Sequence, residues 1–188
     1  MHYEIHVTVE TNDVEKFVSD CKQIKVKPIV IETERDNVFG QQVMTSSKHS
    51  GDDYKKTLAT ICKQLEPNYK IVRQKVEIFP ESDKHPDHIY YESHIRLKLP
   101  HNFDRKPIED LCEMFGFHMS KNLFKKDQDF VYQMITYRSD GHKPIQDFDD
   151  IIDGMVWHLT NRKINFDKVE IEECIFDSNI SIDNSWLY

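Results

Sequence analysis

The feature that most constrains this chain is a short alternating segment that occurs twice. Glu4-Ile5-His6-Val7-Thr8-Val9 returns in the second half of the chain as Glu92-Ser93-His94-Ile95-Arg96-Leu97. The alternation of polar and apolar side chains is typical of a half-buried β-strand. Side chains two apart on a strand point to the same face, so the glutamate and the histidine of each copy lie together. Two strands with the same polar face predict a chain built from two related halves.

The same order of elements is predicted around both copies, namely strand, helix, strand, strand, helix, strand. The ranges in the first half are Glu4–Val9, Val14–Ile24, Lys27–Glu32, Gln41–Ser46, Tyr54–Leu65 and Lys70–Phe79. Those in the second half are Tyr90–Leu99, Lys106–Phe115, His118–Lys125, Phe130–Tyr137, Phe148–Thr160 and Phe166–Phe176. Lys-Val-Glu-Ile also recurs intact, at Lys75–Ile78 and Lys168–Ile171. These matches predict an internal duplication.

The order β-α-β-β-α-β is that of a ferredoxin-like unit. We therefore predict an α+β protein of two ferredoxin-like lobes, residues 1–80 and 89–176, with a polar cleft between their sheets. Residues 81–88, which combine a serine, a proline and several charged side chains, are the predicted linker. Residues 177–188 form a predicted C-terminal tail. Its apolar side chains would pack back on the body or onto a second subunit, and the second arrangement would make a homodimer.

Composition excludes several classes of partner. The net charge of −8 and the pI near 5.7 argue against broad binding to nucleic acid or to an anionic membrane. No apolar run approaches the length of a membrane span. The N-terminus lacks the pattern of a signal peptide, and the four cysteines show no C-x-x-C spacing, so a cytoplasmic protein with reduced thiols is predicted. G-x-x-x-x-G-K and G-x-G-x-x-G are both absent, and no cofactor is predicted.

The predicted cleft collects the polar faces of both halves. His6 and His94 would face each other across it. The other polar side chains expected there are Thr8, Arg96, Gln42, Gln133, Lys75 and Lys168. Burying so many polar groups costs free energy unless each finds a partner, so this surface is the predicted functional site.

A resemblance assigns roles to some of these residues. His6-Val7-Thr8-Val9 and His94-Ile95-Arg96-Leu97 resemble the paired motifs of the two-histidine (2H) phosphoesterases, which carry H-x-[ST]-hydrophobic once in each half. The resemblance implies that His6 and His94 are general base and general acid on a nucleotide-like phosphodiester, without a metal, and that Thr8 holds a phosphate oxygen. The second motif departs from the pattern, because Arg96 replaces the hydroxyl residue. Arginine can bind phosphate in a bidentate manner. The implied ligand is a small phosphorylated molecule.

A second resemblance covers nearly the whole chain. The segments that carry it are Glu4–Val9, Lys27-Pro28, Gln42–Ser47, Ser120–Asn122 and Asp177–Asn179, which resemble an uncharacterised family of small proteins. This resemblance supports the fold and implies no mechanism.

Two other classes of function fit the same residues. The cleft would be a non-catalytic binding site for a small anionic ligand or a protein. Alternatively, Glu4, His6, Glu92 and His94 would hold a divalent metal for a metal-dependent enzyme, since carboxylate and imidazole are common metal ligands. The sequence leaves open whether the protein is an enzyme.

Overall fold

The computed structural model describes residues 1–35, 38–80, 84–122, 127–139, 141–142 and 144–184. The elements of the first half are β1 (His2–Glu10), α1 (Val14–Gln23), β2 (Lys27–Arg35), β3 (Val38–Ser50), α2 (Tyr54–Leu65) and β4 (Lys70–Ile78). Those of the second half are β5 (Tyr90–Pro100), α3 (Lys106–Phe115), β6 (His118–Asn122), β7 (Phe130–Arg138), α4 (Ile145–Asn161) and β8 (Phe166–Asp177). A short 3-10 helix, η1 (Ile180–Asp183), follows β8. The predicted order of elements is therefore observed in both halves.

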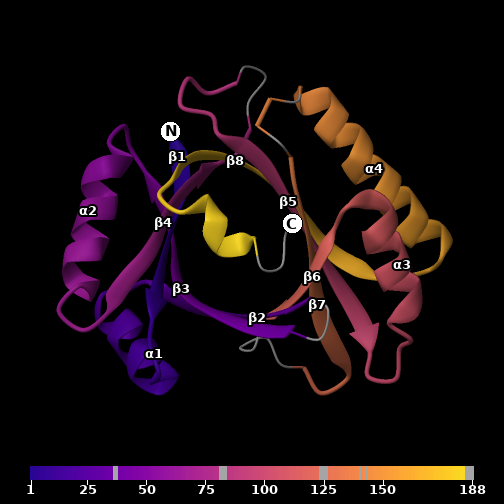
Figure 1. Cartoon of the computed structure of the whole chain (residues 1–188), viewed down its shortest axis with the longest axis horizontal. Helices are drawn as coiled ribbons and strands as arrows, with labels where there is room; N and C mark the ends of the chain where they lie inside the picture. The colour runs from indigo at the N-terminus through magenta and orange to yellow at the C-terminus, as the bar shows by residue number, and fades with distance from the viewer. Residues whose placement is uncertain (36–37, 81–83, 123–126, 140, 143, 185–188) are drawn as a thin grey trace.

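The eight strands form one closed antiparallel barrel, in the order β1-β3-β2-β6-β7-β5-β8-β4 (Figure 1). The prediction of two ferredoxin-like lobes with a cleft between their sheets is therefore wrong. A separate four-stranded sheet would leave the backbone groups of its two outer strands unpaired. Here β4 pairs with β8 and β2 pairs with β6, so each half satisfies the edges of the other.

The hydrophobic cores lie outside the barrel, under the helices. α1 and α2 cover one side of the barrel, and α3 and α4 cover the opposite side (Figure 1). Ile5 and Val7 of β1 are fully buried in the first core, which includes Phe17 of α1. Ile95 and Leu97 of β5 hold the matching places in the second core. Because apolar side chains on these strands face outward to the helices, the polar ones face inward.

Local signals explain the helix ends. The Asp13 carboxylate caps α1 by accepting a hydrogen bond from the backbone N–H of Lys16. The Asp53 carboxylate caps α2 in the same way, through the backbone N–H of Lys56. α3 ends at Gly116, whose φ of 74° is a left-handed conformation that glycine adopts without strain. β3 extends past the predicted strand to Ser50, because its last residues pair with the start of β1. No helix in the described part of the chain is long and apolar enough to cross a membrane.

Candidate functional site

The inner face of the barrel lines a cavity of about 750 Å³. Every site residue predicted from the sequence lines it. These residues are His6, His94, Thr8, Arg96, Gln42, Gln133, Lys75 and Lys168, together with Glu4 and Glu92 of the alternative metal set. The predicted polar surface is thus the interior of a closed barrel rather than a cleft between two sheets.

Strand register brings the inward side chains together. On β1 and β4 the cross-strand pairs are Glu4 with Glu77, His6 with Lys75 and Thr8 with Arg73. On β5 and β8 they are Glu92 with Glu172, His94 with Glu170 and Arg96 with Lys168. The register of β4 against β8 shifts between Val76 and Glu77, which marks a bulge. A bulge re-aims the side chains next to it.

His6 lies between a backbone carbonyl and two carboxylates. Its Nδ1 is 3.2 Å from the carbonyl oxygen of Thr45, and its Nε2 is 3.2 Å from Glu77 Oε2 and 3.6 Å from Glu4 Oε1. Burial alone would lower the pKa of His6, but Glu77 and Glu4 favour the imidazolium and raise the pKa above its usual value.

His94 has a matching environment in the second half. Its Nδ1 lies 2.9 Å from Thr136 Oγ1, and its Nε2 lies 3.4 Å from Glu92 Oε2 and 3.5 Å from Glu172 Oε2. Burial opposes the charge, yet Glu92 and Glu172 raise the pKa of His94 to about 9. At neutral pH this side chain is an imidazolium and therefore a proton donor.

A buried lysine, Lys75, lies between the carboxylates that contact the two histidines. Lys75 Nζ lies 2.5 Å from Glu77 Oε1 and also forms an ion pair with Glu92. Arg138 donates from Nε to Glu92 Oε1 at 2.9 Å. Burial raises the pKa of Glu77, but Lys75 and His6 outweigh it and lower that pKa to about 2. Glu77 is therefore a permanent anion between the two halves of the barrel.

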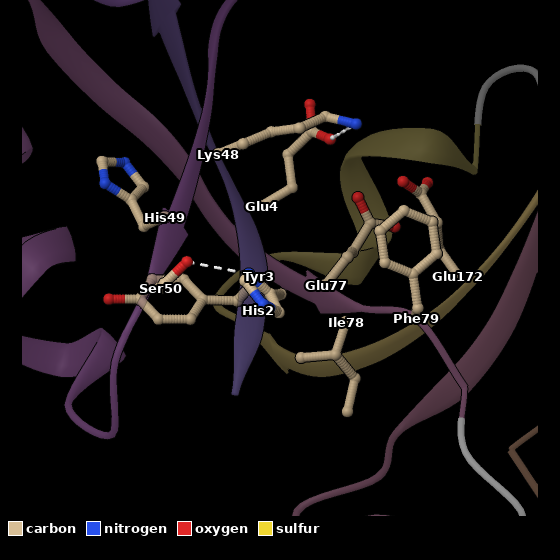
Figure 2. Close-up of a pocket in the computed structure, with 10 residues that line it drawn as sticks. All are labelled: His2, Tyr3, Glu4, Lys48, His49, Ser50, Glu77, Ile78, Phe79 and Glu172. Carbon is tan, nitrogen blue, oxygen red and sulfur yellow. Dashed lines mark hydrogen bonds and ion pairs between the residues drawn. The ribbon is translucent and has the colours of Figure 1, made fainter.

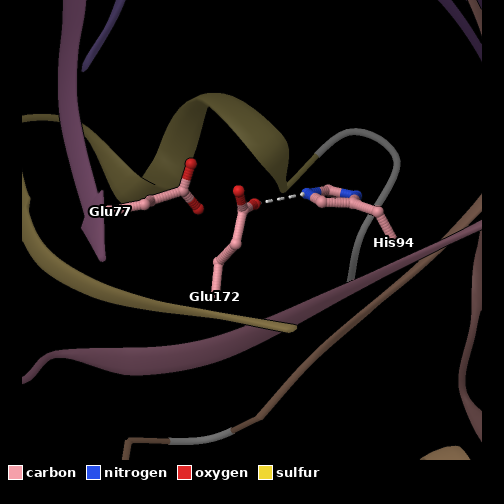
Figure 3. Close-up of side chains that lie close together, drawn as sticks. All are labelled: Glu77, His94 and Glu172. Atoms are coloured by element: carbon pink, nitrogen blue, oxygen red, sulfur yellow. Dashed lines mark ion pairs between the residues drawn. The ribbon is translucent and has the colours of Figure 1, made fainter. Parts of the chain in front are cut away.

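Glu172 is the cavity carboxylate whose negative charge is least stabilised by neighbouring cations. Only 7% of the residue is exposed, and its carboxylate forms an ion pair with His94 at 3.5 Å (Figure 3). Burial and the nearby charge of Glu77 raise the pKa of Glu172 to about 7. This carboxyl group can therefore accept or release a proton near neutral pH.

Glu77, His94 and Glu172 also have the geometry of a metal-binding group. One ligand atom from each lies within 4.8 Å of the others, and two carboxylates with one imidazole suit a divalent transition metal. Within the described residues this group shares only His94 with the metal set predicted from the sequence. The Lys75 ammonium already pairs with one oxygen of Glu77.

Several predicted ligand-binding side chains already have protein partners. Arg96 donates from Nε and Nη2 to Asp167, at 2.6 and 3.0 Å, and Lys168 pairs with Glu170. The side chain of Lys168 keeps 40% exposure and that of Arg96 keeps 26%. Gln133 donates to the carbonyl oxygen of Ser120. Lys168 and Arg96 thus remain accessible from the barrel opening.

Five of the other residues that line the cavity carry charge close to the two histidines or to the arginine pair, and they were not selected from the sequence. They are Arg73, Glu77, Arg138, Glu172 and Asp183. Arg73 and Glu77 lie two residues from Lys75 on β4, and Glu172 lies four residues from Lys168 on β8, so alternation from those positions would have found these three. Arg138 lies five residues from Gln133 on β7, and alternation does not lead to it. Asp183 had no such signal, since it lies in the tail.

A second hollow of about 290 Å³ adjoins the cavity (Figure 2). It shares Glu4, Lys48, Glu77 and Glu172 with the main cavity. Lys48 pairs with Glu4 at 3.4 Å, and Phe79, which is 57% exposed, lies next to Glu172 in the view. The two hollows therefore meet at these four side chains.

Charge inside the barrel differs from that of the whole chain. The cavity lining includes seven lysine or arginine residues and six aspartate or glutamate residues. The chain as a whole carries a net charge of −8. The positive and negative side chains are therefore nearly balanced in the interior, since Asp177 and Asp167, which lie outside the lining, pair with Arg73 and Arg96.

No protein-family model matches the sequence, and no curated protein matches it. Among solved structures, the small subunit of acetolactate synthase from Thermotoga maritima is 16% identical. The match covers 94% of this chain and 96% of that one, with a TM-score of 0.33. An unknown protein from Galdieria sulphuraria is 12% identical over 92% of this chain and 97% of that one, with a TM-score of 0.28. Likenesses at this level carry no conclusion about function.

Proposed function

We propose that the protein is an enzyme that binds a small phosphorylated molecule inside its barrel and performs acid–base chemistry on a phosphodiester. The observation that carries the proposal is the pairing of His94 and Glu172 in one cavity, with pKa values near 9 and 7. Shifted pKa values inside a cavity are typical of catalytic sites. A cavity of about 750 Å³ can accommodate a molecule of nucleotide size.

The two groups suit opposite steps of the reaction. His94 is protonated at neutral pH and would donate a proton to the leaving oxygen. Glu172 is half-ionised near pH 7 and would accept a proton from the attacking water. Arg96, Lys168 and the other basic side chains would bind the phosphate oxygens. His6 faces Glu77 at 3.2 Å and would stabilise that anion rather than act as the base that the family resemblance implies.

The test is a screen of linear and cyclic phosphodiesters with wild type, His94→Gln and Glu172→Gln. We expect each variant to lose turnover by roughly 10² to 10⁴-fold, the usual contribution of a positioned acid or base. His101→Gln is the matched control, because His101 is exposed and contacts the carbonyl oxygen of Gln128 outside the cavity. Circular dichroism must show that all variants are folded. If wild type binds phosphorylated compounds but turns none of them over, the protein is a non-catalytic binding module and the proposed enzyme is wrong.

The pH profile offers a second check on the roles. Glu172 must lose its proton to act as a base, so activity should rise with pH through about 7. His94 must keep its proton to act as an acid, so activity should fall through about 9. Glu172→Gln should remove the rise at lower pH. A profile that is flat between pH 6 and 10 would contradict both assignments.

A metal-dependent enzyme is the second candidate, favoured by the grouping of Glu77, His94 and Glu172 within 4.8 Å. The two candidates differ in their response to a chelator. Acid–base catalysis without a metal is unaffected by chelation, whereas a metal enzyme loses activity and regains it when Zn²⁺ or Mn²⁺ is returned.

A further inference from the structure

The C-terminal tail places a carboxylate inside the barrel. η1 lies across the barrel opening in Figure 1, and its last residue, Asp183, is 1% exposed and lines the cavity. Asp183 Oδ2 accepts hydrogen bonds from Arg73 Nη1 at 2.7 Å and from Arg138 Nη2 at 2.6 Å. Asp183 Oδ1 accepts one from Gln42 Nε2 at 3.0 Å. Three donors from β3, β4 and β7 thus converge on a single anion.

The two arginines offer more than a carboxylate can use. Arg138 is buried, and its Nη1 has no hydrogen-bond partner within the described residues. Its guanidinium lies over the ring of Tyr90, with Cζ 4.3 Å from the ring centroid. A carboxylate has two oxygens, whereas a phosphate group has three or four that can accept hydrogen bonds from a guanidinium fork. Arg138 therefore keeps one donor that a phosphate group in the place of the Asp183 carboxylate could use.

The segment that carries Asp183 is held mainly by polar contacts. Ile180 of η1 is 37% exposed, and Ile182 is partly exposed. Asn179 donates from its side chain to the carbonyl oxygen of Val72 at 3.0 Å. Among the described contacts of Asp183, those that would be lost on its release are hydrogen bonds and ion pairs, which an incoming anion would replace.

We propose that Arg73, Arg138 and Gln42 form a phosphate subsite of the cavity, which Asp183 occupies in this structure and leaves when a phosphorylated ligand binds. The tail would then act as a competitor for the ligand. Asp177 pairs with Arg73 through Nε at 3.0 Å, so that arginine stays positioned when Asp183 leaves. Glu92 holds Arg138 in the same way. This inference rests on the proposed function only in its choice of phosphate as the ligand.

The first test compares phosphate binding by wild type and Asp183→Asn, with inorganic phosphate and pyrophosphate as probes in calorimetry. The asparagine keeps the shape of the side chain and removes the competing charge. We expect Asp183→Asn to bind pyrophosphate at least about tenfold more tightly than wild type, because hydrogen bonds to charged groups are among the stronger ones. Asp52→Asn is the control for the change in net charge, since the Asp52 side chain is fully exposed. Its affinity should equal that of wild type.

The second test uses the wild-type protein and therefore does not depend on how a variant folds. Hydrogen exchange of the backbone amides of Ile180–Asp183 should become faster when pyrophosphate is added. Arg138→Gln should remove the tighter binding from the Asp183→Asn background. Unchanged exchange of η1, or equal affinities of wild type and Asp183→Asn, would overturn the inference.

The outcomes separate this inference from the proposed function. Pyrophosphate binding that Asp183→Asn strengthens, without turnover of any phosphodiester, supports the subsite and contradicts the enzyme. Turnover that requires His94 but is indifferent to Asp183 supports the enzyme and overturns the subsite. If neither wild type nor Asp183→Asn binds pyrophosphate, the cluster is a structural ion-pair network and the subsite is wrong.

Discussion

At the scale of single residues, the charge of each histidine in the cavity depends on the carboxylates of its own strand and of the neighbouring strands. Glu92 is two residues before His94 on β5 and therefore shares its inward face. Glu172 comes from β8, through strand pairing. Together they reverse the effect of burial and raise the pKa of His94 to about 9.

This pKa makes a prediction about stability. A histidine with a higher pKa in the folded protein than in the unfolded chain binds more protons in the folded state between the two values. Its stabilisation is complete below about pH 6.5 and is lost as the pH rises through about 9. The free energy of unfolding of wild type should fall over this range by up to about 1.4 kcal/mol per pH unit more than that of His94→Gln. Urea denaturation at pH 6, 7.5 and 9 measures this, and parallel curves would contradict it.

Lys75 supports a second prediction at this scale. Its ammonium neutralises Glu77 and Glu92, and its side chain is 8% exposed. Lys75→Met would leave two buried carboxylates without their shared cation, and we expect a loss of about 3–5 kcal/mol in the free energy of unfolding. The double variant Lys75→Met/Glu92→Gln should recover part of that loss. A Lys75→Met protein as stable as wild type would show that the cluster is hydrated rather than dry.

At the scale of elements, the strands differ in how firmly they are paired. Within the described residues, β1 pairs with β3 over eight positions, whereas β6 pairs with β2 over three and with β7 over three. β6 nevertheless closes the barrel, because it is the strand of the second half that meets β2. The two halves are joined by two strand pairs, and β2–β6, with three described residue pairs, is shorter than β4–β8, with four.

We therefore expect local opening to begin at β6. Amide hydrogens of His118–Asn122 should exchange faster than those of β1 and β5, because fewer backbone hydrogen bonds must break to release them. Hydrogen exchange followed by mass spectrometry measures the difference. Protection of β6 equal to that of β1 would mean that the barrel opens only by global unfolding.

At the scale of the whole molecule, the charged interior makes the two halves dependent on each other. Ligand atoms of Glu77 from the first half lie within 4.8 Å of those of His94 and Glu172 from the second, and Asp183 joins Arg73 to Arg138 across the barrel. Separating the halves would expose two sheet edges in each and remove these ion pairs. Unfolding should therefore be a single cooperative transition. Far-UV circular dichroism and tryptophan fluorescence should give the same midpoint in urea, and two resolved midpoints would contradict this.

The sequence by itself determined the order of strands and helices and the inward direction of the polar side chains. Both follow from local periodicity, because a strand alternates its faces wherever it is placed. This is why His6, His94 and the other predicted residues all line one cavity, even though the predicted arrangement of the halves was wrong. Glu77 and Arg73 follow from the same alternation on β4.

Only the tertiary structure decided how the sheets close and which charges meet. β4 and β8 are far apart in the sequence, and their pairing is a long-range contact. The register shift between Val76 and Glu77 has no signature in the local sequence from which it could be predicted. The grouping of Glu77 with His94 and Glu172, and hence the pKa of about 7, depends on that register. Asp183 reaches the arginines only because the chain folds back after β8. Local propensity cannot specify such contacts, since they are stabilised by partners far away in the sequence.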